Sequence, residues 1–201
     1  MYQIQSEYLF PTQIVRGQLP NFQEIQQPLI NWIYNYKSKN NDIARISNKG
    51  GWQSENKEVF TDEGFKPFEK AIIGCVNELC MEFRLAQSLR LMQMWINVNG
   101  PNSYNVSHRH PGCILSGVLW VKQIPEMGRF VFDNMDNGYR DALLLTNTDV
   151  RHLAINKMSP EIVPKYTNGT IMIFPSGLSH RVEINTTQED RLTLSFNICY
   201  G

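Results

Sequence analysis

Three of the four histidines in this chain have a spacing that could bind one metal ion. His108 and His110 are separated by a single residue, and His180 follows a Phe-Pro-Ser segment at residues 174–176. Side chains at positions i and i+2 of a β-strand point to the same face, about 6.6 Å apart. Neutral imidazole is a frequent metal ligand near physiological pH. We therefore expect these histidines to hold one face of an octahedral metal, which leaves positions open for a co-substrate and oxygen.

The length and charge of the chain narrow the classes of protein to which it can belong. A chain of 201 residues is expected to fold as one domain with a substantial core. Lysine plus arginine balance aspartate plus glutamate at 19 each, which does not favour nucleic acid or anionic membranes as partners. With no long apolar run and no secretion signal at the start, we expect no membrane contact and a cytoplasmic location. The four cysteines form no C-x-x-C pair, so we expect reduced, packed thiols rather than a zinc or iron–sulfur site.

The first third of the chain is expected to be helical. Residues 21–24 have the pattern of a capping box, in which the Asn21 side chain accepts a hydrogen bond from the first helical turn. This helix should run through Pro28, which bends it or resets its start, to about Lys39. A second helix should begin at Pro67, because proline suits a first turn and a stripe of apolar residues at helical spacing follows it.

A polar segment at residues 40–66 separates the two expected helices and is predicted to form loops. Within it, residues 47–54 combine a pair of glycines with Trp52. Such a segment could form the rim of a pocket, or it could be a plain surface turn over a buried Trp52.

The pattern changes to β-strands from about residue 91. Met94, Ile96 and Val98 alternate with polar or aromatic residues, as in a strand with two distinct faces. Further short strands are expected at residues 114–121, 129–132, 170–174, 181–184 and 192–198. We therefore predict an α+β, mainly-β fold: a double-stranded β-helix, or jelly roll, with N-terminal helices on its outer face. A single domain should span 1–201, with helical support in 1–90 and the jelly-roll core in 91–201.

Several motifs in the strand region carry a family resemblance. They are residues 99–104, 112–121, 128–133, 168–176, 180–182 and 191–197. Together they closely resemble the 2-oxoglutarate- and iron(II)-dependent oxygenases, and specifically a bacterial and phage branch related to prolyl hydroxylases. The resemblance covers residues 91–199, and the segment 47–54 is also similar to that branch. Each motif alone would be weak, but the set is specific.

The resemblance implies a role for each candidate site residue. His108 matches the first iron ligand of such enzymes and His180 matches the distal one. Arg191 and Thr193 match the pair that binds the far carboxylate of 2-oxoglutarate, which agrees with the bidentate fork and permanent charge of a guanidinium. Tyr104 either donates a hydrogen bond to the co-substrate or packs beneath its loop.

His110 departs from the family pattern, because it occupies the place of an acidic iron ligand. Three neutral imidazoles leave the full charge of the metal to be offset by a dianionic co-substrate, and imidazole suits iron. In one alternative, His110 hydrogen-bonds behind the ligands and Asp133 or Asp136 supplies a carboxylate. In another, His110 is the first ligand of a halogenase-like motif in which an anion fills the missing acid's place.

The activity implied by the resemblance is oxidative. Iron(II), 2-oxoglutarate and molecular oxygen would together hydroxylate an unidentified substrate, either a protein or peptide side chain or a small molecule. The relation to prolyl hydroxylases favours the side chain, although a fold does not fix a substrate. One alternative function is a cupin-like metal-binding module without 2-oxoglutarate turnover. Another is a dioxygenase whose substrate itself binds the iron.

Residues around the candidate site are assigned by strand alternation. Trp95 and Asn97 could line the pocket, and Ser116 and Asn197 could face the barrel interior. Arg181 should point away from the metal. His152 is expected to be a solvated loop histidine, and residues 135–165 could form either a substrate-facing lid or an idle excursion.

Overall fold

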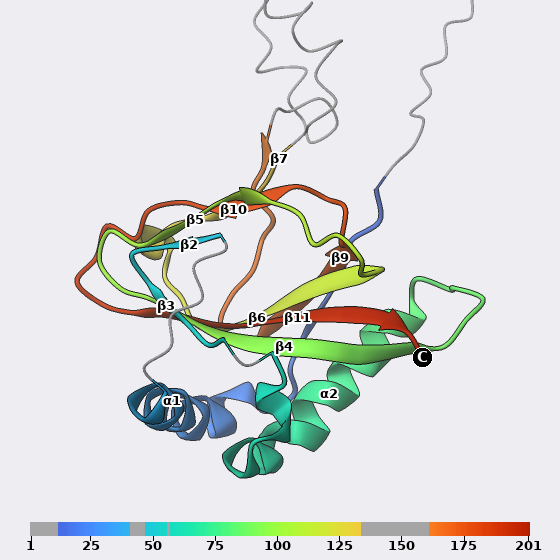
Figure 1. Cartoon of the computed structure of the whole chain (residues 1–201), viewed down its shortest axis with the longest axis horizontal. Helices are drawn as coiled ribbons and strands as arrows, with labels where there is room; N and C mark the ends of the chain where they lie inside the picture. The colour runs from blue at the N-terminus through green and yellow to red at the C-terminus, as the bar shows by residue number, and fades with distance from the viewer. Residues whose placement is uncertain (1–11, 41–46, 56, 134–160) are drawn as a thin grey trace, which may run out of the picture.

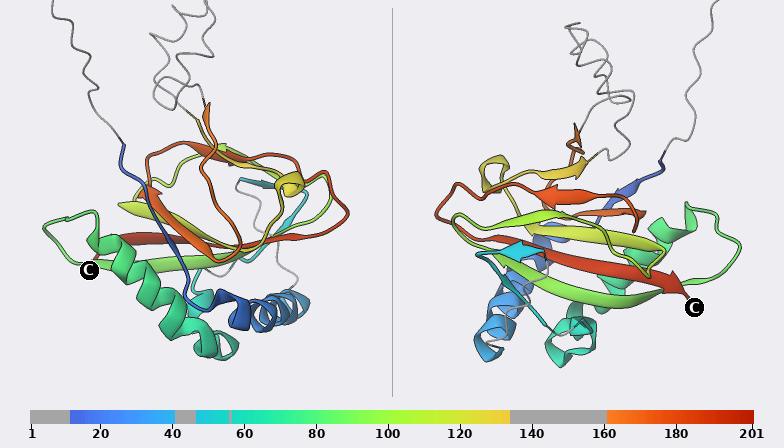
Figure 2. Two further views of the ribbon diagram at one scale, coloured as in Figure 1. Left: turned by 180° about the vertical axis from the view of Figure 1, so that it is seen from behind. Right: turned by 45° about the horizontal axis from the view of Figure 1, so that its top comes forward.

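The structure is a computed structural model that describes residues 12–40, 47–55, 57–133 and 161–201. Two antiparallel β-sheets face each other, and two helices cover the outer face of the larger sheet (Figures 1 and 2). This is the double-sheet jelly roll with N-terminal helices that the sequence predicts. The division into one domain with a boundary near residue 91 stays a prediction.

Eleven strands form the two sheets within the described residues. The larger sheet contains, in order across it, β1 (Val15–Gln18), β9 (Thr170–Pro175), β6 (Leu115–Lys122), β11 (Arg191–Tyr200), β4 (Leu89–Asn99) and β3 (Trp52–Gln53). The smaller sheet contains β2 (Asn48–Lys49), β5 (Tyr104–His108), β10 (His180–Val182), β7 (Phe130–Asp133) and β8 (Glu161–Ile162). The long predicted strands are confirmed. The short strands were not predicted: β1 lies in the part of the chain that was expected to be helical, and β2 and β3 lie in the segment that was expected to form loops.

The helices are α1 (Phe22–Lys39) and α2 (Lys66–Met81), with short 3₁₀ turns η1 (Val59–Thr61), η2 (Glu63–Phe65) and η3 (Pro125–Met127). Helix α1 is continuous through Pro28, and a proline stands in the first turn of α2, as expected. The predicted capping box is wrong. Asn21 has a left-handed backbone with φ of 51° and its side chain makes no capping hydrogen bond. Its carbonyl oxygen accepts from the Glu24 N–H at 3.0 Å, so the backbone closes this turn.

The larger sheet is buried on both faces, and this explains its strand sequences. In β4, Met94, Ile96 and Val98 pack with the helices in one apolar cluster. Trp95 and Asn97, which alternate with them, line a pocket between the sheets. A second apolar cluster fills that space: Val118, Trp120, Phe130, Phe132, Met172, Phe174 and Val182. The pocket is therefore built from the inner faces of both sheets.

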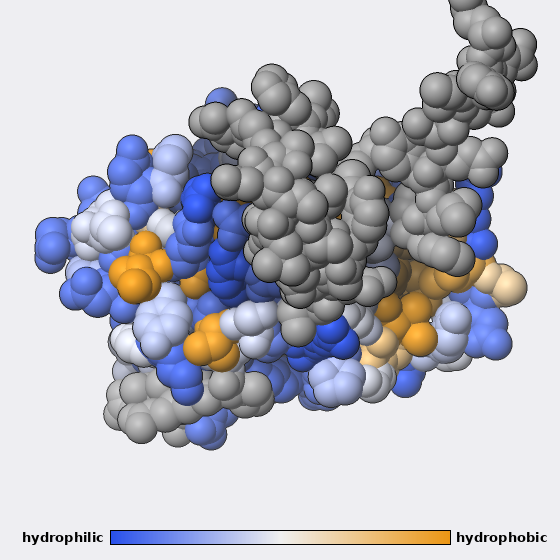
Figure 3. Space-filling model, turned by 90° about the horizontal axis from the view of Figure 1, so that it is seen from above, coloured by the Kyte–Doolittle hydropathy of each residue, from blue (hydrophilic) through white to orange (hydrophobic). Residues whose placement is uncertain are grey.

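The hydropathy of the surface, the character of the helices and the state of the cysteines can be compared with what the sequence predicts. Seen from above, the coloured residues are largely hydrophilic with scattered apolar groups (Figure 3). Among the described residues, no helix has the length and apolar character needed to cross a membrane. All four cysteines are free, as expected.

Candidate metal and co-substrate site

The structure brings the three predicted histidines together. His108 ends β5 and is paired across the smaller sheet with His180, the first residue of β10. His110 lies just beyond β5, where its backbone N–H donates to the carbonyl of Ser176 at 2.9 Å. The ring centroids are 4.3 Å apart for His108 and His180, and 5.1 Å apart for each of the other two pairs. Ring nitrogens from all three lie within 4.8 Å of one another, close enough to converge on one ion.

Each imidazole has its Nδ1 atom occupied by a hydrogen bond. Nδ1 of His108 lies 2.8 Å from the carbonyl oxygen of Val106, and Nδ1 of His180 lies 2.9 Å from that of Leu178. Nδ1 of His110 lies 2.7 Å from the amide Oδ1 of Asn197. These oxygens only accept, so Nδ1 carries the proton and Nε2 keeps its lone pair. The protein thus fixes the tautomer that binds metal through Nε2.

The three rings are held neutral by their surroundings. Burial is the largest cause in each case: it lowers the pKa of His108 and of His110, and it lowers the pKa of His180 to about 3. Neighbouring histidines lower the pKa values of His110 and His180 further, since two positive rings would repel each other. Neutral imidazoles with free lone pairs are the form that a divalent metal requires.

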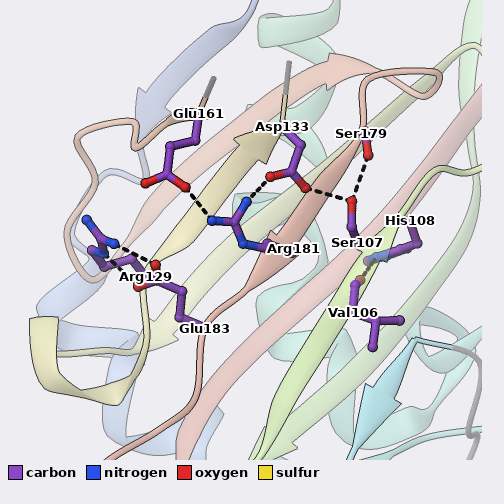
Figure 4. A network of polar contacts seen from close by, with 9 residues as sticks. All are labelled: Val106, Ser107, His108, Arg129, Asp133, Glu161, Ser179, Arg181 and Glu183. Carbon is purple, nitrogen blue, oxygen red and sulfur yellow. Dashed lines mark hydrogen bonds and ion pairs between the residues drawn. The ribbon is translucent and has the colours of Figure 1, made fainter. Parts of the chain in front are cut away.

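No carboxylate joins the histidines in the described part of the chain. Asp133 accepts from the Ser107 hydroxyl at 2.6 Å and forms an ion pair with Arg181, away from the three rings (Figure 4). The alternative in which Asp133 supplies a metal ligand is therefore wrong, and Asp136 lies outside the described residues. Arg181 points away from the histidines, as expected, because strand alternation turns it to the other face of β10.

Arg191 is buried in the same pocket, and little in its surroundings neutralises its positive charge. The residue is 3% exposed and lines the pocket with the three histidines. Its Nη2 donates to Oδ1 of Asn99 at 3.3 Å, whereas Nε and Nη1 have no hydrogen-bond partner among the described residues. Burial lowers the pKa of Arg191 to about 10, so the guanidinium is still charged at neutral pH. A buried cation with unused donors is costly unless an anion completes it.

Thr193 lies beside Arg191 on the same face of β11, as the i, i+2 spacing predicts. It is buried, lines the pocket, and its hydroxyl accepts from the Asn97 amide at 3.3 Å. The expected pocket lining by Trp95 and Asn97 is confirmed, and the Trp95 ring lies 5.5 Å from that of His110.

The placement of Tyr104 in the pocket is wrong. Tyr104 is 36% exposed and does not line the pocket, whereas its neighbour Asn105 is buried and does. Alternation from His108 would turn Tyr104 inward, but the β5–β10 pairing is irregular between His108 and Asn105, where three steps along β5 match two along β10. This irregularity reverses the alternation, so Asn105 faces the pocket and Tyr104 points outward.

Two positions acquire roles that the sequence did not assign. Asn197 accepts from both His110 and the Ser116 hydroxyl, the latter at 2.9 Å. Ser47, from the glycine-containing segment, lines the pocket, which favours the rim over the plain surface turn. Residues 191, 193, 195 and 197 share one face of β11, so alternation from Arg191 places Asn197 on the inner face, as expected, but its contact with His110 depends on which residues lie opposite it. His152 and most of residues 135–165 lie outside the described residues.

A comparison with protein-family models decides the family. A model described as "Putative 2OG-Fe(II) oxygenase" matches residues 93–197, which is more than half of the chain. The chain belongs to this family of oxygenases. Its members are oxidoreductases that use iron(II) and 2-oxoglutarate, and the resemblance found in the sequence is confirmed. No curated protein sequence is significantly similar to this oxygenase.

Solved structures share the fold of this oxygenase at low sequence identity. A Pseudomonas putida prolyl-4-hydroxylase is 12% identical with a TM-score of 0.63, over 94% of each chain. A Trichoplax adhaerens prolyl hydroxylase in complex with a hypoxia-inducible-factor peptide is 11% identical with a TM-score of 0.63, over 93% and 83% of the two chains. HygX from Streptomyces hygroscopicus, with nickel and 2-oxoglutarate bound, is 12% identical with a TM-score of 0.57, over 94% and 83%.

Proposed function

We propose that this oxygenase binds iron(II) through His108, His110 and His180 and hydroxylates a protein or peptide side chain. Arg191 and Thr193 bind the far carboxylate of the 2-oxoglutarate co-substrate. The observation that carries the proposal is the buried guanidinium of Arg191, with two unused donor atoms, in the pocket that the three histidines line.

The donor set suits a ferrous ion. Three neutral imidazoles would hold one face of an octahedral ion and leave three positions for other ligands. They add no charge, so a bound ferrous ion would keep its charge of +2 and attract the 2-oxo acid end of the co-substrate, while the second carboxylate would meet Arg191. Iron with 2-oxoglutarate and oxygen supplies the oxidising power to hydroxylate a C–H bond, which no side chain can provide.

The residues of this chain bind and orient the reactants and exclude water from them. The guanidinium and the Thr193 hydroxyl fix one end of the co-substrate. Trp120, Phe130 and Phe174 are buried, line the pocket and give it apolar walls. Such walls keep bulk water away from reactive species.

Support for a peptide substrate comes from the folds that the chain shares. The Trichoplax adhaerens enzyme was crystallised with a peptide, and the Pseudomonas putida enzyme is a prolyl-4-hydroxylase. We test this proposal by measuring succinate release with a library of peptides and with small molecules. A peptide that stimulates release and gains one oxygen atom in mass supports it. Stimulation by small molecules alone would contradict it.

The binding roles are tested by anaerobic calorimetry. Iron(II) and then 2-oxoglutarate are titrated into the wild-type protein and into the variants His110→Ala and Arg191→Ala. We expect sequential binding in the wild type, loss of iron binding in His110→Ala, and loss of 2-oxoglutarate binding with iron binding retained in Arg191→Ala. Iron binding that survives in His110→Ala would remove His110 from the ligand set.

The cupin-like module without 2-oxoglutarate turnover is disfavoured by the same feature. A protein that only binds metal has no need for a buried, unneutralised guanidinium in its pocket, and keeping one costs stability. Unchanged 2-oxoglutarate affinity in Arg191→Ala would restore this alternative.

A further inference from the structure

A group of buried amides, from Asn48, Asn99 and Asn105, lies beside Arg191 at the edge of the pocket. All three residues are at least 93% buried, with exposures of 3%, 1% and 7% respectively. They come from β2, β4 and β5, so the amide cluster joins the two sheets where the pocket is lined by Asn105. The family assignment and the proposed ligands leave the cluster without a role.

Asn99 is the member that contacts Arg191. The two residues are directly opposite each other in the β4–β11 register, and Asn99 Oδ1 accepts from Arg191 Nη2 at 3.3 Å. Asn99 Nδ2 faces two acceptors, Oδ1 of Asn48 at 3.1 Å and Oδ1 of Asn105 at 3.5 Å. Because the amide nitrogen is committed to acceptors, the amide oxygen must face the guanidinium.

The segment 47–54 is shaped to hold this amide. The Asn48 Nδ2 donates to the carbonyl of Gly51 at 2.7 Å. A Cβ atom at Gly51 would lie 2.8 Å from both Asn48 Oδ1 and Asn99 Nδ2, so only glycine lets the chain pass this close. Gly50, with φ of +77°, makes the turn that brings the segment back from β2 to β3.

The chemistry of Asn99 matters as much as its position. Aspartate has nearly the same shape, but its carboxylate would pair with Arg191 and cancel the charge in the pocket. A neutral amide holds one nitrogen of the guanidinium and leaves Nε and Nη1 with their hydrogens unused. The positive charge then stays available to an incoming anion.

We propose that Asn99 is a positioning residue, which holds Arg191 as an unneutralised cation for 2-oxoglutarate, and that the segment 47–54 keeps Asn99 in place. This inference rests on the proposed role of Arg191. It predicts that a carboxylate at position 99 would act as an internal competitor for the co-substrate.

The test replaces Asn99 by aspartate and measures ligand binding and thermal stability separately. With nickel(II) in the site, we expect Asn99→Asp to lower 2-oxoglutarate affinity about 100-fold in calorimetry, because Arg191 is already paired. Nickel affinity should stay within about twofold of the wild type. The melting temperature of the metal-free protein should stay close to that of the wild type, because the new ion pair with Arg191 offsets the loss of the two hydrogen bonds that Asn99 Nδ2 donates to Asn48 and Asn105.

Two further variants make the result specific. Asn168→Asp adds the same carboxylate at a partly buried amide that does not line the pocket, and it should leave 2-oxoglutarate affinity unchanged. Gly51→Ala changes no charge but displaces the Asn48–Asn99 pair. It should weaken 2-oxoglutarate binding about tenfold, as loss of an outer supporting contact typically does.

Each other outcome overturns the inference. If Asn99→Asp binds 2-oxoglutarate as the wild type does, Asn99 does not control the charge of Arg191. If Asn99→Asp loses nickel and 2-oxoglutarate alike and melts earlier, Asn99 is only structural. Wild-type protein that binds nickel but no 2-oxoglutarate would refute the proposed function itself, a result that the variants do not affect.

Discussion

At the residue scale, the three histidines proposed to bind metal are oriented in two different ways. His108 and His180 each use the carbonyl oxygen of the residue two positions earlier, Val106 and Leu178. This is a local arrangement that a strand backbone provides by itself. His110 lies beyond the end of β5 and uses the side chain of Asn197 on β11. The position that departs from the family pattern is thus also the one that depends on a distant side chain.

Asn197 should therefore control how tightly His110 binds metal. We expect Asn197→Ala to weaken nickel binding about 10- to 100-fold in calorimetry, since His110 loses the acceptor that fixes its tautomer and ring angle. Gln93→Ala is the matched control, because it removes only the acceptor of the Asn197 Nδ2 at 2.9 Å and leaves the Oδ1 atom in place. Equal effects in both variants would contradict this assignment.

Residue type and spacing predicted the three histidines, and the resemblance to the oxygenase family added Arg191 and Thr193. The amides could not be predicted, because the roles of Asn99 and Asn197 depend on which residues lie opposite them across strands. Tyr104 failed for the same reason: its identity suggested a hydrogen-bond donor, but only the register of β5 shows that Asn105 faces inward. Cross-strand register is determined by the whole sheet and cannot be predicted from a short sequence motif.

At the element scale, polar contacts on the outer side of the smaller sheet tie together the strands that carry the histidines. Ser107 and Ser179, which precede His108 and His180, have their hydroxyl oxygens 2.9 Å apart (Figure 4). Ser107 also donates to Asp133 at the end of β7. The contacts hold β5, β10 and β7 in register directly behind two of the proposed metal ligands.

Removal of the central acceptor should loosen this arrangement. We expect Asp133→Ala to weaken nickel binding several-fold, because β5 and β10 lose a shared partner. Glu183→Ala is the control: it breaks an ion pair with Arg129 that also joins the β7 and β10 segments but touches neither serine (Figure 4). A comparable loss of nickel affinity in Glu183→Ala would mean that any weakening of the sheet has this effect.

Close packing of β6 against β11 gives a prediction on stability. A Cβ atom at Gly117 would lie 2.3 Å from the Phe196 ring and 2.8 Å from the Met172 carbonyl oxygen. We expect Gly117→Ala to lower the free energy of unfolding in urea by about 1–3 kcal/mol. At Gly74 in α2, a Cβ atom would meet nothing within 4 Å, so Gly74→Ala should raise the free energy of unfolding by about 0.4–1 kcal/mol. The opposite ranking would contradict the packing seen here.

Element length decided which parts of the fold could be predicted. The strands β4 and β11 are long and alternate, β6 is a long, almost fully buried run, and the helices have apolar stripes at helical spacing. In contrast, β2 and β3 contain two residues each and β1 contains four, too few for any period to appear. Their pairing comes from neighbouring strands, so only the assembled sheets define them.

At the scale of the whole molecule, the two faces of the larger sheet have different roles, since one contributes to the stability of the fold and the other to the candidate site. One face packs against the helices, and the other lines the pocket. Ile72 in α2 is fully buried on the helical side. We expect Ile72→Ala to lower the free energy of unfolding by about 2–5 kcal/mol in urea, while nickel affinity stays the same under native conditions. A parallel loss of nickel affinity would show that the helices also set the geometry of the site.

Because His108 is paired with His180, an ion bound by both would cross-link two segments that are far apart in the chain. Strand β10 is only three residues long, and its pairing with β5 is irregular between His180 and Val182. Local opening should begin there, because short, irregular ladders give little protection. Metal that binds only the closed form would suppress this opening in proportion to its concentration. Amide hydrogen exchange in β5 and β10 would then report the occupancy of the site.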